Sequence, residues 1–430
     1  MDKSDCCYQS YLAILKEELV PAMGCTEPIC LAYAAAKARE LLGTMPKRVE
    51  IKASGNIIKN VKSVIVPNTK GMKGLKASVA AGIVAGNPDK ALEVIAEVTP
   101  EQKQQIVKFL DDTLMTIVPL NVIAQLDVTV TLYDGNQSAS VRIAGHHTNI
   151  VKMEKNEEVL FDSGYEADAN AKLTDRKCLC MKKIYDFANT VDIEELKPII
   201  CPQMECNKAI AMEGLKNNWG ANVGSTILRV GNDIRQKAKA WAAAGSDARM
   251  SGCEMPVIIN SGSGNQGMTV SLPILAFAEE FHIDEDRTIR AVALSNLVAI
   301  HQKTGIGRLS AYCGAVSAGC ASGCGIAYLL GHSFDIIEHT LENALGMAAG
   351  IVCDGAKPSC AGKIALAVEA GLLGFEMSKN GDNLLGGDGI IGKDVEETID
   401  HIGCLGRYGM KETDVEILKI IPVWSPSILR

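Results

Sequence analysis

Aromatic residues are scarce in this sequence: Phe, Tyr and Trp together make up 4% of 430 residues. Glycine is frequent, with 40 copies, so the core must pack through small and aliphatic side chains, which favours close helix–helix contacts. The 47% of hydrophobic residues supply enough apolar surface to offset the entropy lost on folding, which excludes a disordered protein. The length predicts two or three domains at about 150 residues each.

Positive charge is not in excess either. The 43 basic and 51 acidic side chains give a formal net charge of −8, which argues against a nucleic-acid-binding protein, because phosphate binding needs clustered Lys and Arg. Residues 1–20 have neither the basic start nor the apolar core of a signal peptide. We therefore expect a cytoplasmic protein.

Long hydrophobic runs are almost absent, and residues 309–331 are the one stretch that needs a membrane test. This stretch carries no charge and is long enough to span a bilayer of about 30 Å. However, it is rich in Gly, Ala, Ser and Cys, and Ala315, Gly319 and Gly323 recur every four residues. This spacing lets neighbouring backbones approach closely. We expect a buried helix and no membrane partner.

Cysteine, by contrast, is abundant, and its 15 copies are an odd number. A chain of this length does not need disulfide bonds for stability, so the thiols point to metal binding or catalysis.

The hydrophobic pattern predicts an α+β fold with two domains. In a smaller domain, residues 1–180, we expect helices over 8–20, 26–42 and 73–115, a β-like segment over 49–66 and a β-meander over 122–161. The polar residues 154–180 mark the boundary. In residues 181–430 we expect a mostly helical domain whose Ala- and Gly-rich helices are buried, over 183–218, 228–246, 267–281, 286–302, 308–331, 335–352 and 360–378. Because this half is so apolar, a homodimer is possible.

The stretch 306–364 is the most informative for chemistry. It contains Cys313, then Cys353, which we expect to close one helix, and Cys360, which would open the next after Pro358. A thiol at a helix N-terminus ionises more easily, and iron or zinc requires the thiolate. The spacing is not a CxxC signature, so buried cysteines that merely fill space remain an alternative.

Cys25 is the second candidate, because it also precedes a predicted helix, and Gly24 beside it would let the backbone approach a ligand. Third, a glycine-rich loop leads into a helix and could hold a carboxylate or phosphate through Ser261, Ser263, Asn265 and Gln266, although it could also be a simple tight turn.

His146 and His147 follow the meander, but adjacent strand residues point to opposite faces, which favours substrate recognition by His147 and Thr148 over metal binding. The remaining cysteine pairs lack further ligands, and we expect structural roles for Cys178, Cys180, Cys201 and Cys206.

Several motifs together resemble one family. The chain is similar to the L-cysteine desulfidases, which are related to the α-subunit of iron–sulfur L-serine dehydratases. The similarity extends over almost the whole chain and rests on AMGCTEP, IAGHHTNIV, SGSGNQG, IGRLSAYCGAVSAG and VCDGAKPSCAGK.

The resemblance implies a [4Fe–4S] cluster held by Cys313, Cys353 and Cys360, with Cys25 as the catalytic base. Three thiolates leave one iron without a protein ligand, so that it can act as a Lewis acid. The implied reaction is β-elimination on a small amino acid, in the first place L-cysteine to pyruvate, ammonia and hydrogen sulfide. The residues that we expect to hold the substrate are His147, Thr148, Ser261, Ser263, Asn265, Gln266, Lys303 and Lys363.

Three alternatives stay open. The same machinery could act on L-serine. Pyridoxal phosphate performs the same elimination, and the serine–glycine loop resembles a phosphate cup, although no lysine clearly takes the Schiff-base role. The cysteines could also serve a non-catalytic metal-binding or redox-sensing protein.

Overall fold

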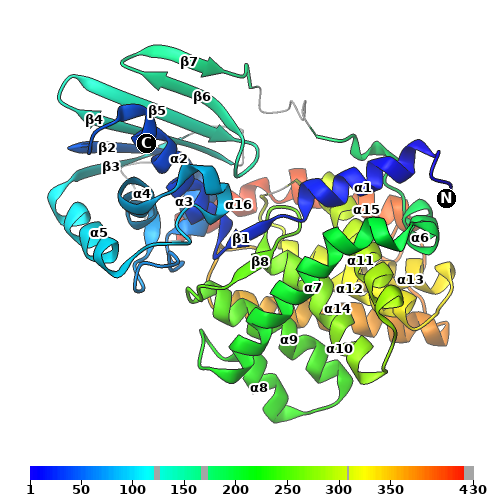
Figure 1. The fold of residues 1–430 in the computed structure, drawn as a ribbon. Helices are drawn as coiled ribbons and strands as arrows, with labels where there is room; N and C mark the ends of the chain where they lie inside the picture. The colour runs from blue at the N-terminus through cyan, green and yellow to red at the C-terminus, as the bar shows by residue number, and fades with distance from the viewer. Residues whose placement is uncertain (121–125, 166–172, 308, 421–430) are drawn as a thin grey trace.

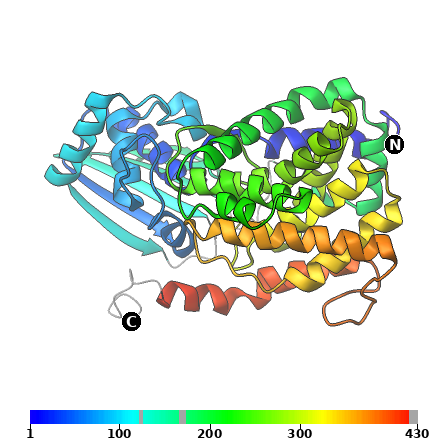
Figure 2. The ribbon, with the colours of Figure 1, turned by 90° about the horizontal axis from the view of Figure 1, so that it is seen from below.

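The computed structural model describes residues 1–120, 126–165, 173–307 and 309–420, and it confirms the α+β fold. A six-stranded sheet with its helices forms the smaller region, and a larger region is mostly helical (Figure 1). The N-terminus lies at the far end of the helical region (Figure 2). Among the described helices none is long and apolar enough to cross a membrane.

The sheet has the strand order β3-β2-β4-β5-β6-β7. Its first two strands, β2 (Arg48–Ser54) and β3 (Leu114–Leu120), are parallel. All other neighbours are antiparallel, including the meander of β4 (Asp127–Asp134), β5 (Gln137–Ala144), β6 (Ile150–Lys155) and β7 (Glu158–Asp162). The predicted meander is thus confirmed, except that its residues 122–125 lie outside the described residues.

Two predicted segments before the meander were wrong in part. The β-like segment 49–66 holds only β2, after which the chain forms helix α3 (Gly55–Val61), where the buried residues Ile57, Ile58 and Val61 follow a helical spacing. The predicted helix 73–115 is interrupted at two prolines. It contains α4 (Gly74–Ala85), a 3₁₀ helix, η1 (Pro88–Glu93), and α5 (Pro100–Asp112), which begins at a capping box of Thr99 and Gln102.

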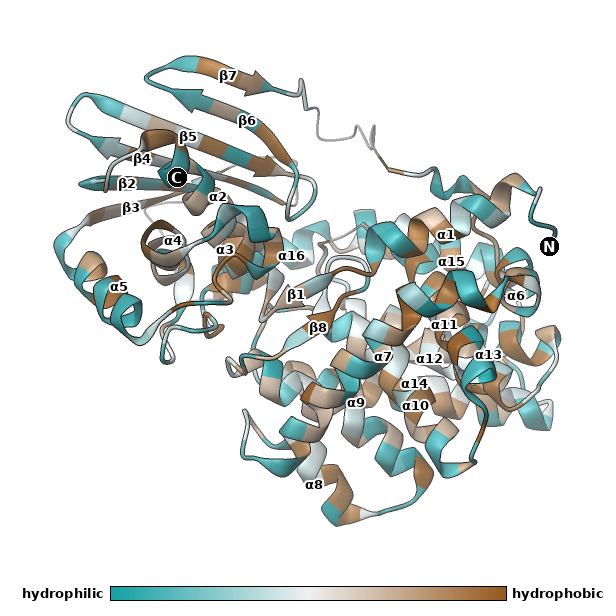
Figure 3. Cartoon of the chain, in the orientation of Figure 1, coloured by the Kyte–Doolittle hydropathy of each residue, from teal (hydrophilic) through white to brown (hydrophobic). Residues whose placement is uncertain are grey.

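Helix α2 (Thr26–Leu42) packs against β4 and β5, and α4 packs against α2. A Cβ atom at Gly82 in α4 would lie 2.1 Å from the carbonyl oxygen of Ala32, so only glycine allows this crossing. The more exposed α5 buries only Ile106 and Phe109, and both hydrophilic and hydrophobic residues are visible along it (Figure 3).

The helical region confirms the predicted helices, although two long predicted ranges each contain two helices. A helix break at the N-cap Asp192 divides the first, and residues 231–233 divide the second. The helices are α6 (Met181–Thr190), α7 (Ile193–Lys216), α8 (Val223–Val230), α9 (Ile234–Met250), α10 (Gly264–Glu280), α11 (Glu285–Ile306), α12 (Gly314–Leu329), α13 (Phe334–Ala348), α14 (Cys360–Asn380), α15 (Val395–Cys404) and α16 (Lys411–Ile420), with a 3₁₀ helix, η2 (Arg176–Cys178), before them and a π-helical turn, η3 (Leu405–Gly409), before α16.

The predicted close approach of small residues occurs between α12 and α14. A Cβ atom at Gly319 would lie 2.4 Å from the carbonyl carbon of Ala367, and one at Gly371 would lie 2.4 Å from the carbonyl oxygen of Gly319. The two backbones therefore touch, and this contact fixes the two helices relative to each other.

We predict that Gly371→Ala lowers the free energy of unfolding by about 1–3 kcal/mol, because an added methyl group must push two helices apart. Gly362→Ala in the same helix is the matched control. Nothing lies within 4 Å of its added Cβ, so we expect a gain of about 0.5–1 kcal/mol. Urea unfolding of both variants measures the difference, and equal stabilities would contradict the tight crossing.

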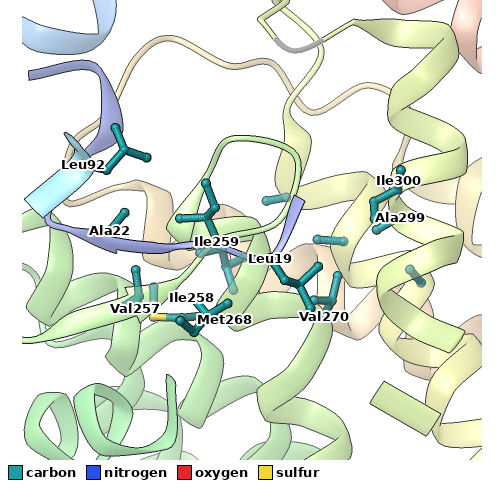
Figure 4. Close-up of a cluster of buried hydrophobic side chains, with 14 of the residues drawn as sticks. Leu19, Ala22, Leu92, Val257, Ile258, Ile259, Met268, Val270, Ala299 and Ile300 are labelled. Carbon is teal, nitrogen blue, oxygen red and sulfur yellow. The ribbon is translucent and has the colours of Figure 1, made fainter. Parts of the chain in front are cut away.

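The first residues of the chain pack on the helical region. Helix α1 (Cys6–Glu18) contacts α7 and α11, and strand β1 (Pro21–Met23) pairs antiparallel with β8 (Pro256–Ile258). Figure 4 shows the apolar side chains that surround this pairing, among them Leu19, Ala22, Val257 and Met268. A division of the chain at residue 180 therefore cuts through the packing of α1 and β1.

Candidate active site

One cavity of about 100 Å³ lies where the two regions meet. Its wall contains residues from α2 and α3 on one side and from α9, α10, α11, α12 and α14 on the other. Cys25 and the three cysteines of the resemblance, Cys313, Cys353 and Cys360, line it, together with most of the residues expected to hold a substrate. The full set of polar and cysteine side chains on the wall is Cys25, Glu27, Asn56, Lys59, Asn60, His147, Arg249, Ser261, Ser263, Asn265, Gln266, Lys303, Ser310, Tyr312, Cys313, Cys353 and Cys360.

A short antiparallel bridge brings Cys313 and Cys353 together. The backbone N–H of Cys313 donates to Ile351 O at 3.1 Å, and that of Cys353 donates to Ala311 O at 2.6 Å. Cys313 is the N-cap of α12, which begins at residue 314; residues 309–313 of the predicted helix are not helical, and its predicted start, residue 308, lies outside the described residues. Cys353 does not close a helix, because α13 ends at Ala348 and the chain turns into the bridge.

Cys360 is the first residue of α14, as predicted. Burial nevertheless raises the pKa of its thiol, and burial together with neighbouring Cys353 raises the pKa of Cys313 to about 12. The effect of burial thus outweighs that of the helix N-termini in the metal-free protein.

The donor set of these three cysteines fits an iron–sulfur group. Soft thiol ligands meet the N-terminal ends of α12 and α14, which favour negative charge. The three Sγ atoms are not among the described groups of ligand atoms within 4.8 Å of one another, which a single ion would require. A cluster of several irons accommodates wider ligand spacing.

Cys25 caps the start of α2, as predicted, and packs with Val64 and Met250. Cys360 packs against the same small apolar cluster, which places it near Cys25. Gly24 has φ of +66°, and a Cβ atom there would lie 2.1 Å from Pro67 Cγ. The close approach that glycine permits is therefore to Pro67 and not to a ligand.

The carboxylate of Glu27 contacts Cys25 directly. Cys25 Sγ donates to Glu27 Oε2 at 3.0 Å, and Asn60 Nδ2 donates to Glu27 Oε1 at 2.9 Å. Burial and the negative charge of Glu27 hold the pKa of the Cys25 thiol well above its usual value. Burial alone would raise the pKa of Glu27, but His147 and the thiol hydrogen bond outweigh it, so this pKa is lowered. In the free protein the proton is on Cys25 and Glu27 is ionised.

The glycine-rich loop leads into a helix, α10, as predicted. Ser261 and Gly262 both have positive φ, and Thr26 Oγ1 donates to Gly262 O at 2.9 Å, which fastens the loop to the start of α2. A Cβ atom at Gly267 would lie 2.1 Å from Ile258 O, so glycine is required where the first turn of α10 passes the end of β8. The N-termini of α2, α10, α12 and α14 thus all lie at the cavity.

Arg249 is a cavity residue that the sequence analysis missed. It is buried at the end of α9, and its Nη1 donates to Asn265 Oδ1 at 3.1 Å. Within the described residues, its Nε has no hydrogen-bond partner, and neither has the buried Gln266 Oε1. No motif marks Arg249, because only the fold brings the end of α9 to the loop before α10. Glu27 was also missed as a site residue, although its position two residues after Cys25 was a usable signal.

The other substrate candidates differ in placement. His147 is buried on the cavity wall, in the loop between β5 and β6 and not on a strand, and Lys303 is buried on the opposite side in α11. Thr148 is exposed and does not line the cavity. Lys363 does not line it either. Its Nζ donates to Val352 O at 2.7 Å and pairs with Asp354, so that it fixes the segment that carries Cys353.

The remaining cysteines lie outside the cavity. In the described part of the chain, the groups with three ligand atoms close enough for one ion are Asp5, Cys6 and Cys7, and Asp335, Glu338 and His339. Neither group includes the pairs that we expected to be structural, Cys178 with Cys180 and Cys201 with Cys206.

Comparisons with known proteins show to which family the chain belongs. Residues 89–419 match the family described as the serine dehydratase alpha chain. A UPF0597 protein of Desulfitobacterium hafniense is 56% identical over 423 residues, covering 98% of each chain. UPF0597 proteins of Lachnoclostridium phytofermentans and Treponema denticola are 48% and 46% identical and cover 96% and 98% of this chain and 99% of their own length. With a family match over most of its length, the chain belongs to the serine dehydratase alpha chain family.

Proposed function

We propose that the protein is a lyase that removes the β-substituent of a small L-amino acid, in the first place the thiol of L-cysteine. The observation that supports this most is the single cavity shared by Cys25, Cys313, Cys353 and Cys360. Four cysteines that are up to 335 residues apart in sequence (25 to 360) face one space at the junction of both regions. Cysteines that serve only as core filler have no reason to converge in this way.

Cys313, Cys353 and Cys360 would hold a [4Fe–4S] cluster. When bound, such a cluster supplies an iron without a protein ligand, which acts as a Lewis acid toward the leaving group. The chain itself must bind the substrate, orient it and move its α-proton. The bridge at 311–313 and 351–353, held by Lys363 through Asp354, fixes two of the three thiols in advance.

The substrate carboxylate has a suitable partner in Arg249. Its unpaired Nε faces the start of α10, since a Cβ atom at Gly264 would lie 2.4 Å from it. A guanidinium beside a helix N-terminus is a strong site for an anion. Ser261, Ser263, Asn265, Gln266 and Lys303 line the same part of the wall.

Cys25 Sγ would take the α-proton of the substrate as the base, once its own thiol proton has left. Loss of hydrogen sulfide from L-cysteine then leaves an enamine. The enamine rearranges to the imine, which water hydrolyses to pyruvate and ammonia. The hydrogen bond to Glu27 holds Sγ in one orientation at the cavity wall.

L-Serine is a second candidate substrate, because the leaving group could be a hydroxyl in place of a thiol. The family description, serine dehydratase alpha chain, favours a hydroxyl leaving group. The affinity of iron for sulfur favours L-cysteine.

The test is anaerobic reconstitution with iron and sulfide, followed by assays on L-cysteine and L-serine. We expect pyruvate and ammonia from at least one of them, and sulfide as well from L-cysteine. Iron-loaded protein that releases ammonia from neither amino acid would contradict the proposal and favour a metal-binding or redox-sensing role.

The absorption spectrum decides the pyridoxal phosphate alternative. The structure places two lysines, Lys59 and Lys303, on the cavity wall, where the sequence alone indicated no Schiff-base lysine. A broad brown absorption band would indicate an iron–sulfur cluster. A yellow, iron-free protein with the same activity would indicate that the cofactor is pyridoxal phosphate and not a cluster.

A further inference from the structure

Glu27 is the only acidic residue on the described wall of the cavity. The positively charged side chains on that wall are Lys59, Arg249 and Lys303. Lys59 has its counter-ion outside the cavity wall, because its Nζ lies 2.5 Å from Asp414 in α16. For a ligand with one negative and one positive group, the wall therefore offers positively charged side chains to the anion and one carboxylate, Glu27, to the cation.

The side-chain amide of Asn60 in α3 has a defined orientation beside Glu27. Its Nδ2 must face Glu27, since a carboxylate accepts hydrogen bonds and cannot donate them. This orientation turns its Oδ1 away from Glu27, and within the described residues that buried oxygen has no donor.

The same holds for two further oxygen atoms on the wall. Asn56 Oδ1 and Gln266 Oε1 are buried and lack a donor among the described residues. A buried acceptor without a partner costs about 1–3 kcal/mol, so these oxygens indicate a missing donor group. An ammonium has three N–H donors and no acceptor.

We propose that Glu27, together with Asn60 Oδ1, binds the α-ammonium group of the substrate and restricts the cavity to 2-amino acids with a free amine. The identity of the ligand as a substrate rests on the proposed function, whereas the binding preference does not. With Arg249 on the same wall, the cavity would recognise both charges of a zwitterion. The groups that face Glu27 are Cys25 and Thr26 at the start of α2, Asn60 on α3, His147 after β5 and Arg249 on α9.

The test is a binding measurement on the full-length protein by titration calorimetry. L-Alanine is the probe because it has no β-leaving group and is not consumed, and propanoate is the same molecule without the amine. We expect L-alanine to bind roughly 10- to 100-fold more tightly, as a buried hydrogen-bonded charge pair predicts. Glu27→Gln should remove this preference, because the amide has nearly the same shape without the charge.

Glu254→Gln is the matched control, since it removes the same charge from an exposed residue that pairs with Lys103. It should keep the full preference for L-alanine. A Glu27→Gln protein that retains the preference would overturn the proposal. Should that variant fail to fold, as judged by circular dichroism, the unmodified protein still decides: equal affinity for L-alanine and propanoate, or no binding of L-alanine, would overturn it.

The two proposals fail separately. A protein that prefers L-alanine through Glu27 but releases no ammonia from L-cysteine or L-serine would refute the lyase and keep the ammonium site. A protein that turns over either amino acid with no loss of binding preference in Glu27→Gln would do the reverse.

Discussion

The Cys353→Ala protein, reconstituted anaerobically with iron and sulfide, is expected to lose essentially all of the cluster absorbance. Cys353 is pinned beside Cys313 by two backbone hydrogen bonds, so no other thiol is in place to take over its position. Two remaining cysteines hold a [4Fe–4S] cluster too weakly for it to survive gel filtration. The measurement is the visible spectrum together with bound iron per chain.

Cys320→Ala is the control for this variant. Cys320 follows Cys313 by seven residues, the same separation as that between Cys353 and Cys360. The spacing alone could therefore suggest Cys320 as a cluster ligand. In the structure Cys320 is buried within α12 and does not line the cavity. We expect Cys320→Ala to load iron normally. Full loading of Cys353→Ala would show that Cys353 is not a ligand.

The Cys25→Ala protein is expected to keep the cluster spectrum and to lose exchange of the substrate α-hydrogen with deuterium oxide. A positioned base typically accelerates proton transfer about 10²–10⁴-fold. Cys25 is not one of the three proposed cluster ligands, so the cluster should remain. Exchange is followed by proton NMR, alongside the absorption spectrum of the same sample.

Cys30→Ala is the matched control, because Cys30 lies in the same helix and is fully buried away from the cavity wall. It should exchange at the rate of the unmodified protein. An unchanged exchange rate in Cys25→Ala would remove Cys25 as the base and would direct attention to the ionised Glu27 beside it.

The protonation of Cys25 links the base to the ammonium site. The negative charge of Glu27 raises the pKa of the Cys25 thiol, so a cation that pairs with Glu27 makes this thiol easier to ionise. Arrival of an amino acid would then prepare the base, and the thiol would stay protonated while the cavity holds no ligand.

The sequence predicted much of the site because cysteine is chemically distinctive. The resemblance carried by the motifs around residues 25, 313, 353 and 360 singled out four thiols, and all four line the cavity, while their roles stay a prediction. The loop before α10 was also predicted, because its glycine-rich sequence leads into a helix, and the structure adds that a side chain at Gly267 would meet Ile258.

The ionisation of these thiols was not predictable in the same way. A helix N-terminus favours a thiolate, and the sequence shows where helices begin. Burial opposes ionisation, and burial depends on residues far away in the sequence, such as Met250 beside Cys25. The same limit applies to Arg249, which reaches the cavity only because α9 ends beside the loop of α10.

The segment after β2 shows the corresponding limit for the fold. The apolar residues Ile57, Ile58 and Val61 fit a strand as well as one buried helical turn, and in the structure they form the helix that brings Asn60 to Glu27. A short apolar run does not reveal which partner it will meet.

The pairing of β1 with β8 has a practical consequence for anyone who wishes to dissect this protein. A fragment that starts at Met181 would lose α1 and β1, leaving the backbone edge of β8 and the apolar surfaces of α7 and α11 bare. It would keep every proposed iron ligand and lose the thiol that faces them. The helical region, which carries the three proposed iron ligands, thus relies on the first two dozen residues of the chain to complete its packing.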